Sequence, residues 1–307
     1  MIKFYNLEDG VKEIYEYVPG CWINTVNPSA EEIVYLMEKF GIPEDYITDV
    51  LDLDERSRTE SEDGNQLIII RVPVFNAEHT IPYTTVPLGV ILHGDTMITI
   101  SYTQSEVITD ILNQRARPIT SNKRYFVLDV FNRSSNYFMK YMKELNRKTS
   151  IIEKDLRKSI ENDELNILIK IQKCLVYFMT SLKSNELLLY KLQHTRFAGA
   201  TEDDLDLVDD AVIEVRQAVE MAKIYMDILT GMMDAFASVI SNNLNIVMKR
   251  LTSITIVLML PTLVASLFGM NVPNGMEEYR FAFLAVLVIS TLLSTFALIV
   301  FRKSKLL

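Results

Sequence analysis

The chain has 307 residues, 49% of them hydrophobic, and a formal net charge of −9, which argues against a nucleic-acid partner. Its two cysteines, Cys21 and Cys174, have neither CxxC spacing nor a disulfide pattern, and its three histidines are scattered. We therefore expect two buried thiols in a reducing compartment and no zinc-ligand cluster. The acidic first residues lack an apolar signal-peptide region, so we expect about 250 soluble residues in the cytosol.

Residues 1–120 predict a mixed α/β domain, and three helices stand out in it. Ser29 and Glu32 have capping-box spacing, and the helix that they begin is expected to end at Gly41. A second helix is expected to start at Pro43, and a third to cover about 105–114.

The strands of this domain are predicted from short apolar segments. Residues 66–75 (QLIIIRVPVF) form one candidate, whose end Pro73 should place at an edge or a bulge. Residues 88–93 and 96–102 flank Gly94-Asp95, which is a two-residue hairpin signal.

From residue 121 the composition favours long helices, because no proline occurs between Pro118 and Pro261. We expect long cytosolic helices over 121–200, with a break at 198–200. A further helix should run from Thr201 to Phe268, roughly 100 Å at 1.5 Å per residue, with residues 201–250 as its stalk.

Two apolar segments close the sequence, 251–268 and 281–301, and neither contains a charged residue. Either alone would also suit a buried core helix, but two in succession indicate transmembrane helices. Basic residues lie before the first segment and in the tail 302–307, whereas the loop 269–280 contains Glu277 and Glu278. The positive-inside rule therefore places both termini in the cytosol and the loop outside.

The first apolar segment has a polar stripe at the 3.5-residue period of a helix–helix seam. Ordinary helix packing also uses small and hydroxyl residues, so that interpretation stays open. Two helices are too few to enclose a pore, so a conducting stripe requires an oligomer with this helix around the axis. The stripe comprises Asn245, Met248, Thr252, Thr255, Met259, Thr262, Ser266 and Gly269.

A path of hydroxyls, amides and carbonyls suits Mg²⁺, which dehydrates reluctantly and keeps several waters. The membrane potential would drive its inward passage by about 4.6 kcal/mol per divalent ion at 100 mV. The sequence has no GxxxxGK[ST] phosphate loop and no nucleophile or metal-hydrolase motif, so we expect neither an ATP-driven pump nor an enzyme.

Gly269-Met270-Asn271 ends the first apolar segment, before a short acidic loop and a basic tail. In this place the sequence resembles the CorA-type magnesium transport proteins, whose signature is Gly-Met-Asn. The resemblance implies an α+β cytosolic domain followed by long stalk helices and two transmembrane helices, in a funnel-shaped homopentamer of the plasma membrane.

The same resemblance implies roles for particular residues. Asn271 would bind hydrated Mg²⁺ in an outer ring, and Gly269 would leave room for backbone carbonyls, although a helix cap and a turn would also suit these two residues. Asn245–Lys249 resembles the family's inner pore entrance, and Leu251 falls at its hydrophobic constriction, next to Thr252 on the stripe. Glu277 and Glu278 would attract cations, although Met276-Glu277-Glu278 departs from the family's Met-Pro-Glu.

Six carboxylates lie within residues 202–210, at the start of the stalk. They would suit a solvated helix start, favoured by the helix dipole, and also a cytosolic Mg²⁺ sensor between protomers. The resemblance to the CorA-type family aligns Asp210 with an acidic position that the family uses for regulation, and Asp206 and Asp209 lie beside it. The family's partner aspartate corresponds here to Asn76, with Glu78 nearby.

The leading hypothesis is a magnesium channel that cytosolic Mg²⁺ gates, with Mg²⁺ as the transported and regulatory ion and no other cofactor. Its partners would be copies of itself, membrane lipid and divalent cations. The transported ions could include cobalt and nickel. A zinc exporter or proton-coupled zinc importer of the same fold is the alternative, and a non-conducting membrane sensor is a third. Ion selectivity and transport direction stay open.

Overall fold

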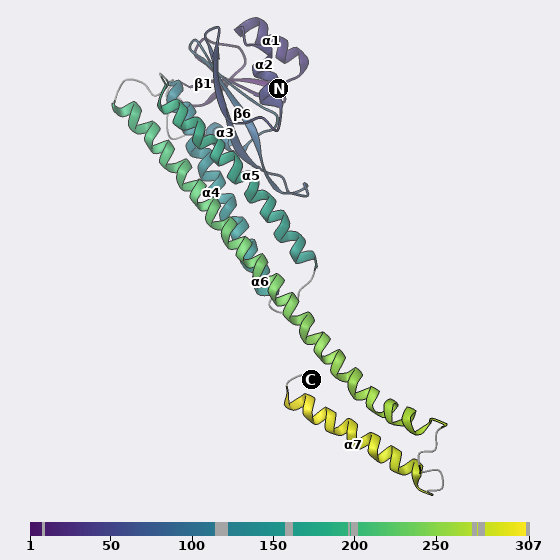
Figure 1. Ribbon diagram of the computed structural model, residues 1–307. Coiled ribbons are helices and arrows are strands. Elements are labelled where there is room, and N and C mark those ends of the chain that lie inside the picture. The colour runs from purple at the N-terminus through teal and green to yellow at the C-terminus, as the bar shows by residue number, and fades with distance from the viewer. Residues whose placement is uncertain are drawn as a thin grey trace. The chain divides into compact units, whose positions relative to one another are not determined.

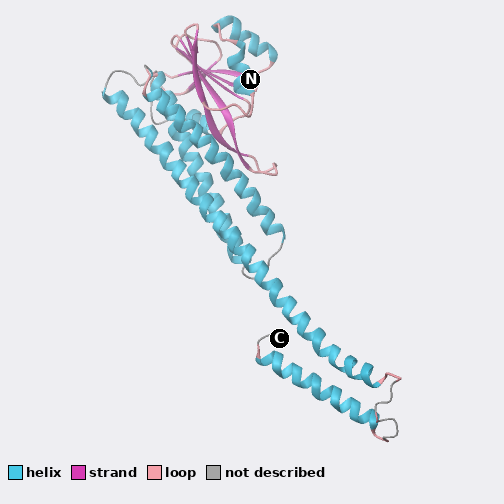
Figure 2. Cartoon of the chain, in the orientation of Figure 1, coloured by secondary structure: helices cyan, strands magenta, loops and turns pink. Residues whose placement is uncertain are grey.

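The structure is a computed structural model that describes residues 1–7, 10–113, 122–156, 162–195, 197, 202–271, 275 and 280–304. The chain divides into two compact units, residues 1–231 and 232–307 (Figure 1). The first unit contains a sheet with helices, and the second is helical (Figure 2).

The sheet of the first unit has seven strands in the order β2-β1-β3-β7-β6-β5-β4. Strands β3 and β7 run parallel, and the other neighbouring pairs are antiparallel. The hairpin predicted at Gly94-Asp95 is confirmed, because His93 of β6 pairs with Thr96 of β7. The strands are β1 (Ile2–Asn6), β2 (Lys12–Ile14), β3 (Trp22–Val26), β4 (Arg58–Glu62), β5 (Asn65–Phe75), β6 (Tyr83–His93) and β7 (Thr96–Ser101).

The position of Pro73 follows from the short partner of β5. Strand β4 pairs with β5 only over Asn65–Ile69, so the part of β5 that holds Pro73 pairs with β6 alone. Proline cannot donate a backbone hydrogen bond, and it is tolerated here because this side of β5 is an edge. The edge expected at Pro73 is therefore confirmed.

Helices α1 (Ala30–Phe40) and α2 (Glu44–Leu51) cover one face of the sheet. The predicted capping box is present: the Glu32 amide donates to Ser29 Oγ at 3.3 Å, and the Ser29 amide donates to Glu32 Oε2 at 2.9 Å. Gly41 ends α1 in the left-handed conformation, at a φ of 60°. Leu36, Phe40 and Val50 are buried against the strands, which fixes this layer.

Helices α3 (Glu106–Asn113), α4 (Lys123–Leu156), α5 (Asn162–Gln193) and the start of α6 (Glu202–Phe268) cover the other face. The buried core here includes Trp22, Phe126, Phe131, Leu189 and Val215. The sheet is thus buried on both sides, which explains why β5 and β6 are nearly continuous apolar runs.

Within the described residues, three helices are long and apolar enough to cross a membrane by length and composition: α5, α6 and α7 (Ala282–Lys303). Residues 163–193 of α5 belong to the first unit, where Phe178, Leu182 and Leu188 are buried by packing. The most apolar window of α7, in contrast, has no buried residue, and that of α6 is 11% buried. An apolar surface left uncovered at this length requires lipid or protein around it.

Helix α6 has 67 residues and continues through Pro261, which agrees with the helix expected from 201 to 268. Of the long helices expected over 121–200, the described residues form two, α4 and α5. The break expected at 198–200 lies outside the described residues.

Both thiols are buried and free as expected, and burial raises the pKa of Cys21 and of Cys174.

Candidate functional site: the polar face of helix α6

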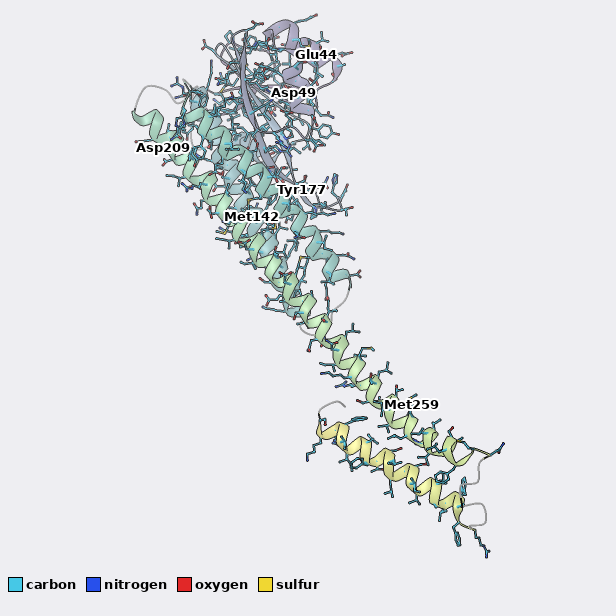
Figure 3. All side chains as sticks on the ribbon, viewed as in Figure 1. Glu44, Asp49, Met142, Tyr177, Asp209 and Met259 are labelled. Atoms are coloured by element: carbon cyan, nitrogen blue, oxygen red, sulfur yellow. The ribbon has the colours of Figure 1, made fainter. Side chains whose placement is uncertain are left out.

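The polar stripe predicted from the sequence lies on the uncovered surface of α6. Asn245, Thr252, Thr255, Thr262 and Ser266 are exposed. The two methionines of the stripe, Met248 and Met259, and the neighbouring Leu251 are more than half exposed (Figure 3 labels Met259). The second unit on its own therefore leaves the whole stripe free to contact solvent or another chain.

Two of the three threonine hydroxyls of the stripe, those of Thr255 and Thr262, are bonded to their own helix. Thr255 Oγ1 donates to the Leu251 carbonyl at 2.8 Å, and Thr262 Oγ1 donates to the Leu258 carbonyl at 3.2 Å. Each hydroxyl proton is thus used inside the helix, and the oxygen lone pairs remain as acceptors. A row of acceptors without fixed charge can receive hydrogen bonds from the waters around a cation.

Helix α7 packs on a different face of α6. Ser253 and Val264 are buried, and Ser294 Oγ of α7 donates to the Val257 carbonyl at 3.5 Å. At about 100° per residue, this face lies roughly half a turn from Thr255, Thr262 and Ser266. Helix α7 therefore covers the side of α6 that is opposite the polar stripe.

At the end of α6, Gly269 donates its amide to the Ala265 carbonyl at 2.9 Å. A Cβ at this glycine would lie 3.0 Å from the same oxygen, which is closer than side chains normally approach. Gly269 has no positive φ, so it does not form the left-handed cap that was one explanation for it. Met270 and Asn271 follow with exposed side chains, and Glu277 and Glu278 lie outside the described residues.

The acidic residues at the start of α6 are exposed: Asp206, Asp209 and Asp210. Asp209 accepts a hydrogen bond from Gln193, near the end of α5 (Figure 3 labels Asp209). Sequence reasoning missed Gln193 as a partner, because nothing local marks a contact between two helices.

Glu78 belongs to the loop between β5 and β6, and its amide donates to Asn76 Oδ1 at 3.0 Å. Tyr83, which follows this loop, packs against Phe178 of α5, fifteen residues before Gln193. At 1.5 Å per residue these two positions on α5 are about 22 Å apart. Within one chain, Glu78 and the α6 aspartates are therefore not brought together. Among the described residues no three His, Cys, Asp or Glu side chains are grouped to hold a metal ion.

Comparison with known proteins assigns this chain to a family. The family model described as "CorA-like Mg2+ transporter protein" matches residues 20–303, which is nearly the whole chain. The chain belongs to the CorA-like Mg²⁺ transporter family. Members are ion transporters of membranes and not enzymes, so the resemblance seen at Gly269-Met270-Asn271 is confirmed.

Curated CorA relatives are similar along most of their length. The cobalt/magnesium transport protein CorA of Methanocaldococcus jannaschii is 26% identical over 255 residues, which are 81% of this chain and 79% of the relative. That of Thermotoga maritima is 21% identical over 292 residues, covering 92% of this chain and 82% of the relative.

Solved structures confirm the CorA fold, an α+β N-terminal domain followed by long helices and a C-terminal apolar helix. The complete CorA magnesium transporter structure from Methanocaldococcus jannaschii superposes with a TM-score of 0.85 at 23% identity, covering 99% of this chain and 98% of the other. The full-length CmaX structure has a TM-score of 0.73 at 17% identity, covering 98% and 96%. The cytoplasmic domain of ZntB from Vibrio parahaemolyticus has a TM-score of 0.63 at 12% identity, covering 78% and 98%.

Proposed function

We propose that this CorA-family chain assembles into a homo-oligomeric channel, a pentamer, that passes hydrated Mg²⁺ across the plasma membrane down the membrane potential. The observation that carries the proposal is the polar stripe of α6, which is exposed on the side opposite α7. Hydroxyls and amides facing hydrocarbon would be costly, so copies of the same helix must cover them. A ring of α6 helices around an axis does so and leaves a polar path.

Selection of the ion is assigned to the outer end of this path. The Asn271 amide oxygen, repeated around the axis, would accept hydrogen bonds from the first water shell of Mg²⁺. Gly269 supports the arrangement because a side chain there would press on the Ala265 carbonyl. Glu277 and Glu278 would raise the local cation concentration by their charge.

The orientation follows from charge. Lys249 and Arg250 precede the membrane part of α6, and Arg302 and Lys303 end α7. Basic residues stay on the cytosolic side, so both termini would be cytosolic and the loop between α6 and α7 would be outside.

Regulation is assigned to contacts between protomers. Asp206, Asp209 and Asp210 are exposed, and Glu78 is too far away to complete a site in the same chain. A Mg²⁺ ion between the α6 aspartates of one protomer and Glu78 of a neighbour would offset carboxylate repulsion and hold the channel closed. Loss of cytosolic Mg²⁺ would then release the protomers.

The deciding experiment measures Mg²⁺ flux into proteoliposomes for the parent and for Asn271→Ala. We expect the variant to assemble normally and to lose uptake at low external Mg²⁺. Asn243→Ala is the matched control, because Asn243 is exposed on α6 away from the stripe. Parent-like uptake by correctly assembled Asn271→Ala would contradict the selectivity role.

The same purified protein serves to identify the transported ion and to measure the oligomeric state. Parallel assays with Zn²⁺, Co²⁺, Ni²⁺ and a pH dye distinguish magnesium conduction from proton-coupled zinc transport, which the ZntB fold likeness alone does not separate. Native mass spectrometry in mild detergent should give a pentamer. A monomer or dimer would exclude the proposed pore, because two helices per chain cannot enclose one.

A further inference from the structure

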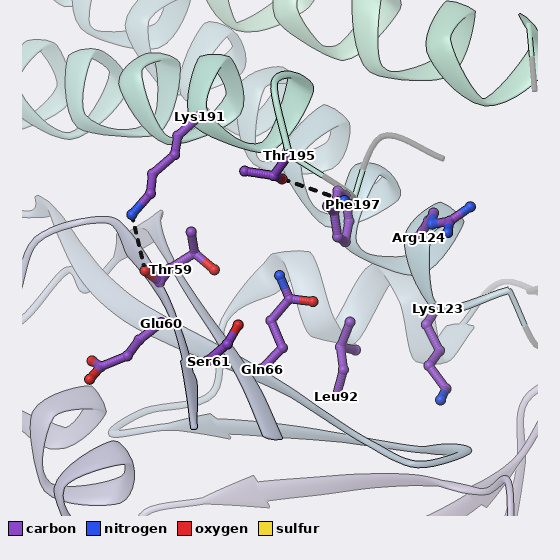
Figure 4. A pocket seen from close by; sticks show the side chains of 10 residues that line it. All are labelled: Thr59, Glu60, Ser61, Gln66, Leu92, Lys123, Arg124, Lys191, Thr195 and Phe197. Carbon is purple, nitrogen blue, oxygen red and sulfur yellow. Dashed lines mark hydrogen bonds between the residues drawn. The ribbon is translucent and has the colours of Figure 1, made fainter. Parts of the chain in front are cut away.

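A cavity of about 600 Å³ in the first unit lies between the β4–β6 end of the sheet and the ends of α4 and α5 (Figure 4). Its two lysines, Lys123 and Lys191, lie at opposite ends, with Gln66, Leu92 and Phe197 between them. This cavity therefore does not gather its charges around one point. The second unit has a groove whose polar groups do meet at one point.

That groove, of about 450 Å³, lies between α6 and α7 within the second unit. Pro261 is in the α6 wall, and the α7 wall includes four hydroxyl residues, Ser290, Thr291, Ser294 and Thr295. The other lining residues are apolar. Hydroxyls at membrane depth bond to carbonyls of their own helix or of a neighbouring helix, so their partners indicate what this wall does.

Pro261 leaves one carbonyl of α6 without its helical partner. Proline has no amide hydrogen, so the carbonyl of Val257, four residues earlier, receives no bond from position 261. Residues four positions apart lie on the same face of a helix, and Pro261 and Val257 share the face that α7 covers. An unpaired carbonyl in hydrocarbon is costly because no water can bond to it. Helix α6 therefore needs a donor from α7 at this place.

Ser294 supplies that donor. Its hydroxyl lies 3.5 Å from the Val257 carbonyl oxygen, which is a long hydrogen bond. Thr291 and Thr295 of the same wall donate instead to carbonyls of their own helix, each at 2.8 Å. The bond to the carbonyl that Pro261 leaves free is thus made by Ser294 and not by these two threonines.

The proline divides the membrane part of α6 into an inner and an outer part. The outer part carries Thr262 and Ser266 of the polar stripe and leads to Asn271. A helix that lacks one bond of its ladder bends more readily at that point. A donor from α7 at the same point opposes the bending, so it fixes the direction in which the outer part continues.

We propose that Ser294 is a positioning residue of the conducting path. By bonding the carbonyl that Pro261 leaves free, it holds the outer part of α6 against α7 and so places the Asn271 amides around the axis. Ser294 does not contact the ion, because α7 covers the side of α6 opposite the polar stripe. The inference rests on the proposed function, since the position of Asn271 affects transport only if the α6 helices form the path.

The test is a double-mutant cycle of Ser294→Ala and Pro261→Ala, with Mg²⁺ flux into proteoliposomes measured at low external Mg²⁺. Ser294→Ala should lower the flux about threefold or more, which is the effect of losing one hydrogen bond between membrane helices. In the Pro261→Ala background the same substitution should not lower the flux, because the new residue donates its own amide to the Val257 carbonyl. Thr295→Val is the matched control, since it removes from the same wall a hydroxyl that bonds inside α7, and it should behave like the parent.

A second readout does not depend on transport. Spin labels at Ser266, beyond the proline, or at Thr255, before it, report the distances between copies of the chain in the assembled protein by pulsed electron paramagnetic resonance. Ser294→Ala should broaden the distances at Ser266 and leave those at Thr255 unchanged. The double variant with Pro261→Ala should show no such broadening.

The two readouts separate this inference from the proposed function. Broadening at Ser266 in a protein without Mg²⁺ flux would support the positioning role and contradict conduction. Parent-like distances at Ser266 in Ser294→Ala, an equal effect of that substitution in both backgrounds, or an equal loss of flux in Thr295→Val would each overturn the positioning role. If Ser294→Ala fails to assemble by native mass spectrometry, the double variant must regain assembly for the proposal to stand.

Discussion

Ser294 of α7 lies with its hydroxyl 3.5 Å from the carbonyl oxygen of Val257 on α6. This contact identifies the side of α6 that α7 covers, together with the buried Ser253 and Val264. It also leaves Thr255 and Met259 on the uncovered side, which gives a direct way to test the pore without knowing the transported ion.

We expect single cysteines at Thr255 and Met259 to react with a water-soluble thiol reagent in the assembled protein and the reaction to block flux. The reason is that a polar path admits water, whereas a helix contact does not. The measurement is labelling by mass shift, with ion flux followed in the same vesicles.

Val257→Cys and Val264→Cys are the matched controls, because their faces contact α7. Both should label slowly and leave flux unchanged. The native Cys21 and Cys174 are buried and contribute little background. Faster labelling at Val257 than at Thr255 would show that α7 does not cover the Val257 face of α6 in the assembled protein. That result would contradict the assignment of the Thr255 face to the water-filled path. Adding Leu251→Cys and Thr252→Cys to the series decides which of the two faces the path.

Asp210→Ala should raise Mg²⁺ flux when internal Mg²⁺ is millimolar and reduce the protection that Mg²⁺ gives against proteolysis. The physical reason is the loss of a carboxylate that a bridging cation would use between protomers. Asp227→Ala changes an exposed aspartate farther along α6 and should alter neither quantity. If both variants behave like the parent, the aspartates at the start of α6 form only a solvated helix end.

Gly89→Ala should destabilise the first unit by about 1–3 kcal/mol, as overpacking of a core does. A Cβ at this position of β6 would lie 2.4 Å from Val50 Cγ2 of α2. Adding Val50→Ala should recover part of the loss, which a strand-propensity effect would not. Gly231→Ala serves as the control in thermal unfolding, since a Cβ there meets nothing within 4 Å and should be neutral or stabilising.

The interactions of Glu32 predict that part of the free energy of unfolding depends on pH. Burial alone would raise its pKa, but hydrogen bonds from the Ser29 and Ile2 amides and the Met1 ammonium outweigh burial and hold the pKa of Glu32 below its ordinary value. Such a group stabilises the folded state above its unfolded pKa of about 4.3, and the contribution is lost as pH falls through the folded pKa.

Glu32→Gln should therefore lower the melting temperature near neutral pH, and the gap to the parent should close as the solution becomes more acidic than the unfolded pKa. Glu31→Gln, in the same helical turn but outside the capping box, should cause a smaller change. A gap that stays constant with pH would show that the capping carboxylate contributes no charge-dependent stability.

Local chemistry in the sequence was enough for the elements that depend on neighbours in the chain. The capping box at Ser29, the hairpin at Gly94-Asp95 and the 67-residue α6 follow from side chains within a few positions of one another. The family was also readable, because Gly269-Met270-Asn271 ends an apolar segment of fixed length.

Only the tertiary structure decided the contacts between distant segments. The parallel pairing of β3 with β7 joins residues 75 positions apart, as Trp22 and Met97 are, and no local pattern predicts it. Residues 163–193 were expected in a long cytosolic helix although they are apolar enough for a membrane, but which surfaces α5 packs against was decided only by the tertiary structure. The same holds for the hydrogen bond from Gln193 to Asp209, since it depends on how two separate helices meet in space.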